Sequence, residues 1–95
     1  MTQITTVSIR IPTALRECCR GAAQFTVSAP DVRAMLEALE RDYPQLHRSI
    51  CDETGAVRQH INVFVNYTSI RDGRGPDTAL APGDVVTILT AVSGG

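Results

Sequence analysis

The residues best suited to chemistry stand at the end of the chain, where Gly94 and Gly95 follow Val92 and Ser93. Glycine lacks a Cβ atom, so such an end can enter a narrow channel and adopt backbone angles closed to other residues. Three extended residues beyond Val92 reach about 10 Å at most. We therefore expect residues 93–95 to form a flexible tail that carries the Gly95 carboxylate into another protein's pocket.

The thiol and imidazole side chains do not form a comparable pattern. Cys18, Cys19 and Cys51 are odd in number and favour reduced thiols over a disulfide framework. Cys18 and Cys19 are interpreted as small apolar filler beneath a loop. His47 and His60 have no partner acid or nucleophile in the spacing. Neither a metal site nor an autonomous enzyme is predicted.

Composition sets the size and class of the protein. With 95 residues, 43% of them hydrophobic, the chain supports one modest core. We expect a single domain over residues 1–92 followed by the tail. A formal net charge of -1 with dispersed signs predicts neither a nucleic-acid nor a membrane partner. Because Met1–Thr6 lacks signal-peptide features and no run approaches the roughly 20 apolar residues of a membrane span, a cytoplasmic location is expected.

All nine basic residues are arginine, and the sequence contains no lysine. Compositional bias is one explanation. The functional alternative is that a chain without ε-amines cannot be acylated at lysine by an activated carboxyl group on a neighbouring copy. Both explanations stay open at the level of sequence.

Alternating or continuous apolar residues predict the strands. Period-two alternation at Val7, Ile9 and Ile11 predicts a strand over Thr5–Ile11, and a second strand antiparallel to it is expected. The final strand is apolar on both parities, which is typical of a central position in a sheet. The strands expected after the first are Ala23–Ser28, Ile61–Asn66, a short one within Asn66–Ile70, and Val85–Val92.

One main helix is predicted between the second and third strands. Ser28 or Asp31 is the candidate cap, a stripe from Val32 to Tyr43 is apolar, and Pro44 ends the helix. The remaining helical turns and loops are short. They are a helical turn within Thr13–Gly21, a turn held by Leu46 and Ile50, a loop tip at 52–55, a charged loop over Arg71–Pro76 and a turn over Asp77–Leu80.

An apolar surface is expected on the sheet face away from the helix. Phe64 stands on the otherwise polar parity of its strand, and Leu89 and Ala91 share one parity of the last strand. Phe64 is either a cross-strand contact within the sheet or an exposed anchor for a partner. The predicted partner interface comprises Phe64, Leu89, Ala91, Val92 and Ser93.

The order of elements and the end of the chain together resemble a known family. The succession β, β, α, β, short β, β with a central last strand is a β-grasp arrangement of the α+β class, with a mixed four- to five-stranded sheet and one main helix on one face. Gly83-Asp84, the strand Val85 to Ala91 and the ending Val92-Ser93-Gly94-Gly95 resemble the ubiquitin-like sulfur-carrier proteins, the ThiS/MoaD group. The segment Ala14-Leu15-Arg16-Glu17 resembles the family's first loop.

Within that family, the chain looks most similar to carriers that act with a cysteine synthase. The long segment before the third strand, Phe64-Val65-Asn66 and Thr87-Ile88-Leu89 carry this likeness. The resemblance implies that an E1-like enzyme adenylates Gly95 with ATP, that a sulfur donor converts the adenylate to a thiocarboxylate, and that a sulfur-accepting synthase consumes it. Gly94 would assist passage of the tail. The carrier itself would bind no cofactor and would be a protein-borne cosubstrate.

Three other functions fit the same pattern. The chain could be the small subunit of a molybdopterin synthase, or a protein modifier that forms isopeptides through Gly95. It could also be a β-grasp interaction module whose tail is incidental, in which case removal of Gly94 and Gly95 would leave its function intact.

Overall fold

The chain begins with a β-hairpin whose strands are joined by a 3-10 helix. In the computed structural model, which describes residues 5–90, β1 (Thr6–Arg10) pairs antiparallel with β2 (Gln24–Ser28). Val7 and Ile9 are buried while the intervening residues are not, as the period-two pattern predicts. The connection η1 (Thr13–Cys19) ends at Arg20, which adopts a left-handed conformation with a φ of 60°.

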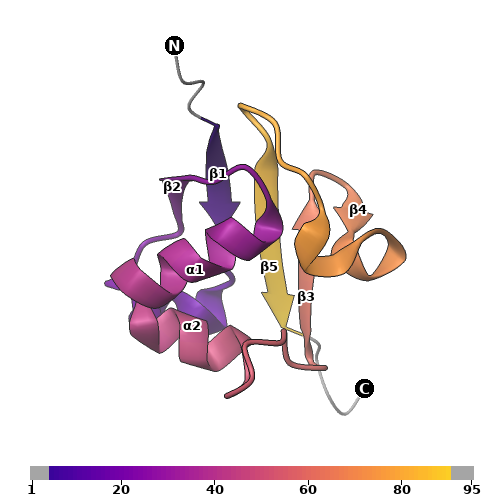
Figure 1. Ribbon diagram of the computed structural model, residues 1–95. Coiled ribbons are helices and arrows are strands. Elements are labelled where there is room, and N and C mark those ends of the chain that lie inside the picture. Colours follow the sequence, from indigo (N-terminus) through magenta and orange to yellow (C-terminus); the bar gives the residue numbers. More distant parts are fainter. Residues whose placement is uncertain (1–4, 91–95) are drawn as a thin grey trace.

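The last strand occupies the middle of a five-stranded sheet. The strand order is β2-β1-β5-β3-β4, with β5 (Val85–Thr90) between β1 and β3 (Ile61–Val65). β5 runs parallel to β1 and antiparallel to β3, and the short β4 (Thr68–Ser69) completes the sheet (Figure 1). This mixed sheet confirms the predicted β-grasp fold, including the central position of the final strand.

Two α-helices lie on one side of the sheet (Figure 1). The main helix, α1 (Val32–Asp42), begins at Asp31, whose Oδ1 accepts the backbone N–H of Ala34 at 2.8 Å. Asp31 rather than Ser28 is therefore the cap. α1 ends before Pro44, as predicted, and Pro44 then occupies the first turn of α2 (Pro44–Ile50), where its missing N–H costs no helical hydrogen bond.

The core lies between the helices and the sheet. The apolar stripe of α1 packs onto residues of β1, β3 and β5 that alternate inward. Val86 and Ile88 of β5 are both fully buried, which fixes this strand's register because a slip by one residue would expose them. The other fully buried large side chains are Ile9, Met35, Leu39, Leu46, Ile50, Ile61, Val7, Val32 and Val63.

The segment between β4 and β5 differs from the prediction. Helical turns occur at η2 (Ile70–Asp72) and η3 (Gly75–Asp77), within the segment expected to be a loop. The turn expected over Asp77–Leu80 is wrong. Backbone bonds from Val32 N to the Thr78 carbonyl and from Leu80 N to the Pro30 carbonyl, both 3.0 Å, hold that segment extended beside the start of α1.

A side-chain clamp joins the β3–β4 turn to the start of β5. Asn66 has a φ of 58°; its Nδ2 donates to Asp84 Oδ1 at 3.1 Å and its Oδ1 accepts from Val85 N at 3.0 Å. Asp84 Oδ2 in turn accepts from Ala81 N at 2.9 Å. Gly83 supplies the positive φ of 87° that this turn requires. The clamp therefore fixes where the final strand enters the sheet.

Candidate functional site

Phe64 and Leu89 lie on the sheet face opposite the helices, on neighbouring strands. Phe64 pairs with Thr87 and Leu89 pairs with Asn62, so Phe64 and Leu89 are diagonal neighbours. Their strand neighbours Val63 and Ile88 are buried on the helix side. Leu89 remains 44% exposed and Phe64 is half-buried. The sheet thus presents two apolar side chains on its uncovered face.

The described part of β5 ends beside this apolar pair. Thr90 pairs with Ile61 at the end of β5, three residues before Ser93, where the predicted tail starts. Ala91, Val92, Ser93, Gly94 and Gly95, which were predicted to form the interface and the reactive end, lie outside the described residues. Their roles, the domain boundary at residue 92 and the flexibility of the tail stay predictions.

A polar group borders the apolar pair on the β3 side. Arg71 donates from Nη1 to Asn62 Oδ1 at 2.6 Å and from Nη2 to the Arg58 carbonyl at 2.8 Å. Both acceptors are neutral, so these bonds orient the guanidinium without compensating its charge. On the β1 side, exposed Arg10 is the register neighbour of Thr87. The apolar pair therefore lies between two arginine-bearing positions.

The sequence pattern predicts these two arginines unequally. Arg10 alternates with Val7 and Ile9 on β1, so the sequence pattern predicts that it faces away from the core. Arg71 stands in a segment without periodicity, and its approach to Asn62 depends on the η2 turn. No sequence signal identifies that contact.

The thiols lie in the hydrophobic core or packed against it. Cys51 and Cys19 are each 1% exposed, and Cys18 is partly buried. Burial raises the pKa of the Cys51 thiol to about 11, and the neighbouring charge of Asp52 acts in the same direction. Burial likewise raises the pKa of Cys19, whose Sγ lies 3.5–3.7 Å from three backbone carbonyls. Both thiols are thus protonated at neutral pH, and the burial of Cys19 is in keeping with its predicted filler role.

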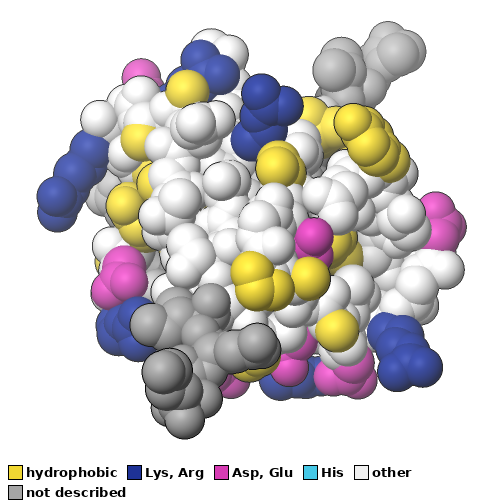
Figure 2. Space-filling model, turned by 90° about the horizontal axis from the view of Figure 1, so that it is seen from above, with side chains coloured by type: hydrophobic (Ala, Val, Ile, Leu, Met, Phe, Trp, Pro, Cys, Tyr) yellow, Lys and Arg dark blue, Asp and Glu magenta, His cyan; other side chains and the backbone are white. Residues whose placement is uncertain are grey.

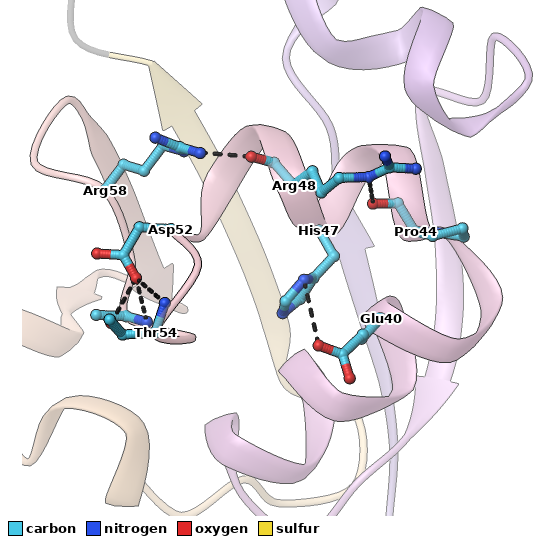
Figure 3. A network of polar contacts seen from close by, with 8 residues as sticks. Glu40, Pro44, His47, Arg48, Asp52, Thr54 and Arg58 are labelled. Atoms are coloured by element: carbon cyan, nitrogen blue, oxygen red, sulfur yellow. Dashed lines mark hydrogen bonds and ion pairs between the residues drawn. The ribbon is translucent and has the colours of Figure 1, made fainter.

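His47 does have an acidic neighbour, contrary to the sequence-based expectation. Its Nδ1 lies 3.7 Å from Glu40 Oε2, across the junction between α1 and α2 (Figure 3). The pair arises because the helices pack side by side, which residue spacing alone cannot show. Figure 3 also shows Asp52 bonded to Thr54 and Arg58 bonded to the Arg48 carbonyl, contacts that hold the chain segment after α2. The exposed side chain of Glu40 and the absence of a nucleophile in this network make it structural.

The charges on the surface are dispersed. Figure 2 shows basic and acidic side chains interspersed over one face, with no gathering of a single sign. Within residues 5–90, no helix combines the length and apolar character that a membrane crossing requires. Within the same range, no three His, Cys, Asp or Glu side chains are grouped so as to hold a metal ion.

Comparison with known proteins agrees with this architecture. The model of the ThiS family matches residues 9–95, which includes nearly all of the sheet and the Gly94-Gly95 end. This chain belongs to the ThiS family. The β-grasp fold and the resemblance drawn from the sequence are thereby confirmed.

Among relatives of this ThiS-family chain is the sulfur carrier protein CysO of Mycobacterium tuberculosis. The two are 35% identical over 91 residues, covering 94% of this chain and 98% of CysO. The crystal structure of that CysO superposes with a TM-score of 0.83 at 34% identity, covering 90% of this chain and 99% of the other. These homologues are small carrier proteins rather than catalysts.

Two further solved structures extend the comparison for this ThiS-family chain. The BexX/CysO complex of Amycolatopsis orientalis gives a TM-score of 0.85 at 29% identity over 94% of this chain and 99% of the other. Small archaeal modifier protein 1 from Methanosarcina acetivorans gives 0.82 at 30% identity over 99% and 100%. The family fold is thus found both in a carrier bound to another protein and in a protein named as a modifier.

Proposed function

We propose that this protein is a sulfur carrier whose Gly95 is adenylated by an E1-like enzyme and converted to a thiocarboxylate that supplies sulfur for cysteine or another metabolite. The observation that supports this most directly is the 35% identity to the sulfur carrier CysO over nearly the full length of both chains. The family match extends to residue 95, so the proposed reactive end belongs to the matched region.

The proposed cycle overcomes the low reactivity of a carboxylate. An α-carboxyl group with an ordinary pKa near 3.5 is ionised at neutral pH and is a poor electrophile. In the first step a Gly95 oxygen attacks the α-phosphorus of ATP, and pyrophosphate leaves. In the second step a sulfide sulfur attacks the acyl carbon and AMP leaves, which yields the thiocarboxylate. Both steps belong to partner proteins, and the carrier retains no ATP.

The uncovered sheet face is proposed to hold the partner while the tail reacts. Ordering a flexible tail costs about 1–2 kcal/mol per residue. Burial of Leu89 and the exposed part of Phe64 in the complex would offset part of this cost, since each apolar Å² removed from water contributes about 25 cal/mol. Arg10 and Arg71 would favour a partner surface that carries carboxylates.

Intact-mass analysis tests the carrier function. Incubation with a matching activating enzyme, ATP and sulfide is expected to replace one oxygen of Gly95 by sulfur. A variant lacking Gly95 is expected to remain unmodified under the same conditions. An unchanged mass of the full chain with every activating enzyme of the source organism would contradict the proposal.

Substitution of Phe64 tests the docking face. Phe64→Ala should weaken binding to the activating enzyme about tenfold, as expected for an aromatic anchor worth more than 1 kcal/mol, and it should leave the domain folded. Tyr67→Ala is the control because it removes an aromatic ring that is 99% exposed in the turn between β3 and β4, outside the paired strands. Isothermal titration calorimetry measures both variants. Equal affinities of Phe64→Ala and the unmodified protein would remove Phe64 from the interface.

A protein modifier is the second candidate function, supported by the likeness to small archaeal modifier protein 1. Both functions use an adenylated Gly95 and differ in what attacks it. Activation in a cell extract with and without added sulfide distinguishes them, since a modifier gives isopeptides to substrate lysines and a carrier gives the thiocarboxylate. Covalent conjugates that persist with sulfide would favour the modifier.

The acceptor of the sulfur is proposed to be a synthase of the cysteine-synthase type, because CysO is the relative that supports the function. Single-turnover transfer from the purified thiocarboxylate to candidate synthases identifies it. Transfer to a molybdopterin precursor instead would assign the protein as the synthase small subunit. A cytoplasmic location is part of the same proposal, since the activating step consumes ATP.

A further inference from the structure

The outer edge of β2 is a long strand edge left open within the described residues. β2 stands at one end of the sheet and pairs only with β1, whereas β4 at the other end has two residues. Proteins usually protect such edges with charged residues, proline or a covering segment. Gln24–Ser28 contains neither a charged residue nor proline, and no described segment pairs with its free side.

The register identifies which backbone groups face outward. Bonds from Ile11 N to the Ala23 carbonyl at 2.9 Å and from Ala29 N to the Thr5 carbonyl at 2.8 Å bracket the hairpin. Hydrogen-bonded and non-hydrogen-bonded pairs alternate in an antiparallel ladder. Phe25 and Val27, which lie two and four residues after Ala23, therefore direct their amides and carbonyls toward β1. The amides and carbonyls of Gln24, Thr26 and Ser28 therefore point away from the sheet.

A groove accompanies this edge on the helix side. It has a volume of about 500 Å³ and lies between β2 and the second half of α1. Val27, Ala38 and Tyr43 contribute apolar atoms to its lining, and the other lining residues are polar or charged: Arg20, Thr26, Ser28, Arg41 and Asp42. An added strand would thus find hydrogen-bond partners along the edge and a pocket for its inward side chains.

The groove carries one positive charge that no described residue compensates. Arg41 is held by Asp42 through two bonds, Nε to Oδ1 at 3.1 Å and Nη2 to Oδ2 at 3.2 Å. Arg20 lines the same groove, and its guanidinium bonds to no side chain or carbonyl among residues 5–90. A carboxylate is the complementary group for Arg20.

We propose that the β2 edge binds an extended segment of a partner protein by strand addition, with apolar side chains in the groove and a carboxylate on Arg20. A second copy of this chain fits less well, because its own β2 is uncharged and offers Arg20 no carboxylate. This site is separate from the proposed sulfur chemistry. β2 and β3 are divided by two strands, so both surfaces can be occupied at once.

A nuclear magnetic resonance titration tests the site with a defined probe. The probe is a blocked octapeptide with alternating Val and Ile at its centre and two Glu residues at each end. Binding should shift the amide signals of Gln24, Thr26 and Ser28 and slow their hydrogen exchange. Exchange at Phe25 and Val27 should stay unchanged, since their amides already bond to β1. This two-residue alternation distinguishes strand addition from contact with side chains.

Variants of both components provide the controls. Arg20→Ala should weaken binding about tenfold, which corresponds to loss of one charge-assisted bond, and Arg20→Glu should favour a probe flanked by Lys. Thr26→Pro should abolish binding yet leave the fold intact, because it removes an amide hydrogen that β1 does not use. A probe with N-methylated central residues should bind at least about tenfold more weakly, since it lacks donors.

Three results would overturn the proposal. The first is the absence of any shift along β2 at millimolar probe. The second is a shift confined to the face of Phe64 and Leu89. The third is protection of Thr26 and Ser28 that depends on protein concentration without probe, which would identify a second copy as the occupant. None of these affects the mass test of Gly95, so the two proposals fail independently.

Discussion

Asn66 shows how one side chain can position the last strand of the described sheet. Its amide bonds to Asp84 and to the backbone of Val85, and its backbone adopts a left-handed conformation. Left-handed φ values cost most residues about 1–2 kcal/mol, and asparagine tolerates them better. The position at which the last strand enters the sheet therefore depends on two properties of asparagine: its tolerance of a left-handed backbone and the hydrogen bonds of its side-chain amide.

Substitution of Asn66 separates these two contributions. Asn66→Gly should lower the free energy of unfolding by about 1–2 kcal/mol through loss of the two side-chain bonds. Asn66→Ala should lower it by about 1 kcal/mol more, because alanine also strains the backbone. Urea unfolding followed by circular dichroism measures both. Equal stabilities of the Gly and Ala variants would show that the conformation imposes no cost.

Asp52 is expected to make stability depend on pH. Bonds from the Thr54 hydroxyl at 2.6 Å and from the amides of Thr54 and Ala56 hold the pKa of its carboxyl below its usual value. A depressed folded-state pKa stabilises the fold above the unfolded value of about 3.9, and this contribution is lost as pH falls through the folded value. The unmodified protein should therefore exceed Asp52→Ala in stability at pH 7 and lose that advantage near pH 2.

Urea unfolding at several pH values measures the difference. Glu53→Ala is the matched control, because it removes an exposed carboxylate from the same loop that accepts no bond in the described structure. A constant gap between Asp52→Ala and the unmodified protein from pH 7 to pH 2 would contradict the assignment.

At the scale of elements, α1 depends on its cap as well as on its apolar face. Asp31→Ala should reduce the free energy of unfolding by about 1 kcal/mol, since it leaves the Ala34 amide without its acceptor. Asp31→Asn should retain most of the stability because asparagine caps equally well. Thermal unfolding of the two variants measures the cap. If both lose the same stability, the carboxylate charge matters more than the bond.

Most of these elements could be predicted because burial imposes a period on the sequence. Val7 and Ile9 mark β1, Ile61 and Val63 mark β3, and each pair faces the core. The segment after β4 could not be predicted in the same way. Thr78 and Leu80 are held by backbone bonds to residues near the start of α1, and such long-range bonds leave no period.

The residues of the candidate site likewise fall into a group that the sequence predicts and a group that it does not. Phe64 and Leu89 could be placed on one face from strand parity, and the register bears out that placement. Arg71 and the His47–Glu40 pair depend on how turns and helices pack, so residue spacing gave no indication of them. The two open backbone edges also follow only from strand order. Side-chain pattern predicts faces, whereas edges and charge pairs require the assembled sheet.

For the whole molecule, the absence of lysine has a measurable consequence under the proposed activation. Adenylated Gly95 should form no isopeptide-linked chains of this protein, because no copy offers an ε-amine. Arg74→Lys introduces one amine at an exposed position and should yield a self-conjugate when ATP and activating enzyme are present without sulfide. Peptide mapping by mass spectrometry detects the linkage. The unmodified protein has no lysine, so polymers formed from it would show that another group accepts the activated carboxyl.

The central place of β5 also governs when a newly made chain can fold. Without β5, the β1–β2 and β3–β4 hairpins are not joined into one sheet, and their apolar faces do not form one continuous surface. Pairings this distant in sequence form slowly, and during translation β5 leaves the ribosome after β1, β2, β3 and β4. A product that stops before β5 is complete stays unfolded and exposed to proteases. Under the proposed activation, folding would thus keep molecules that lack β5 out of the pool available to the activating enzyme.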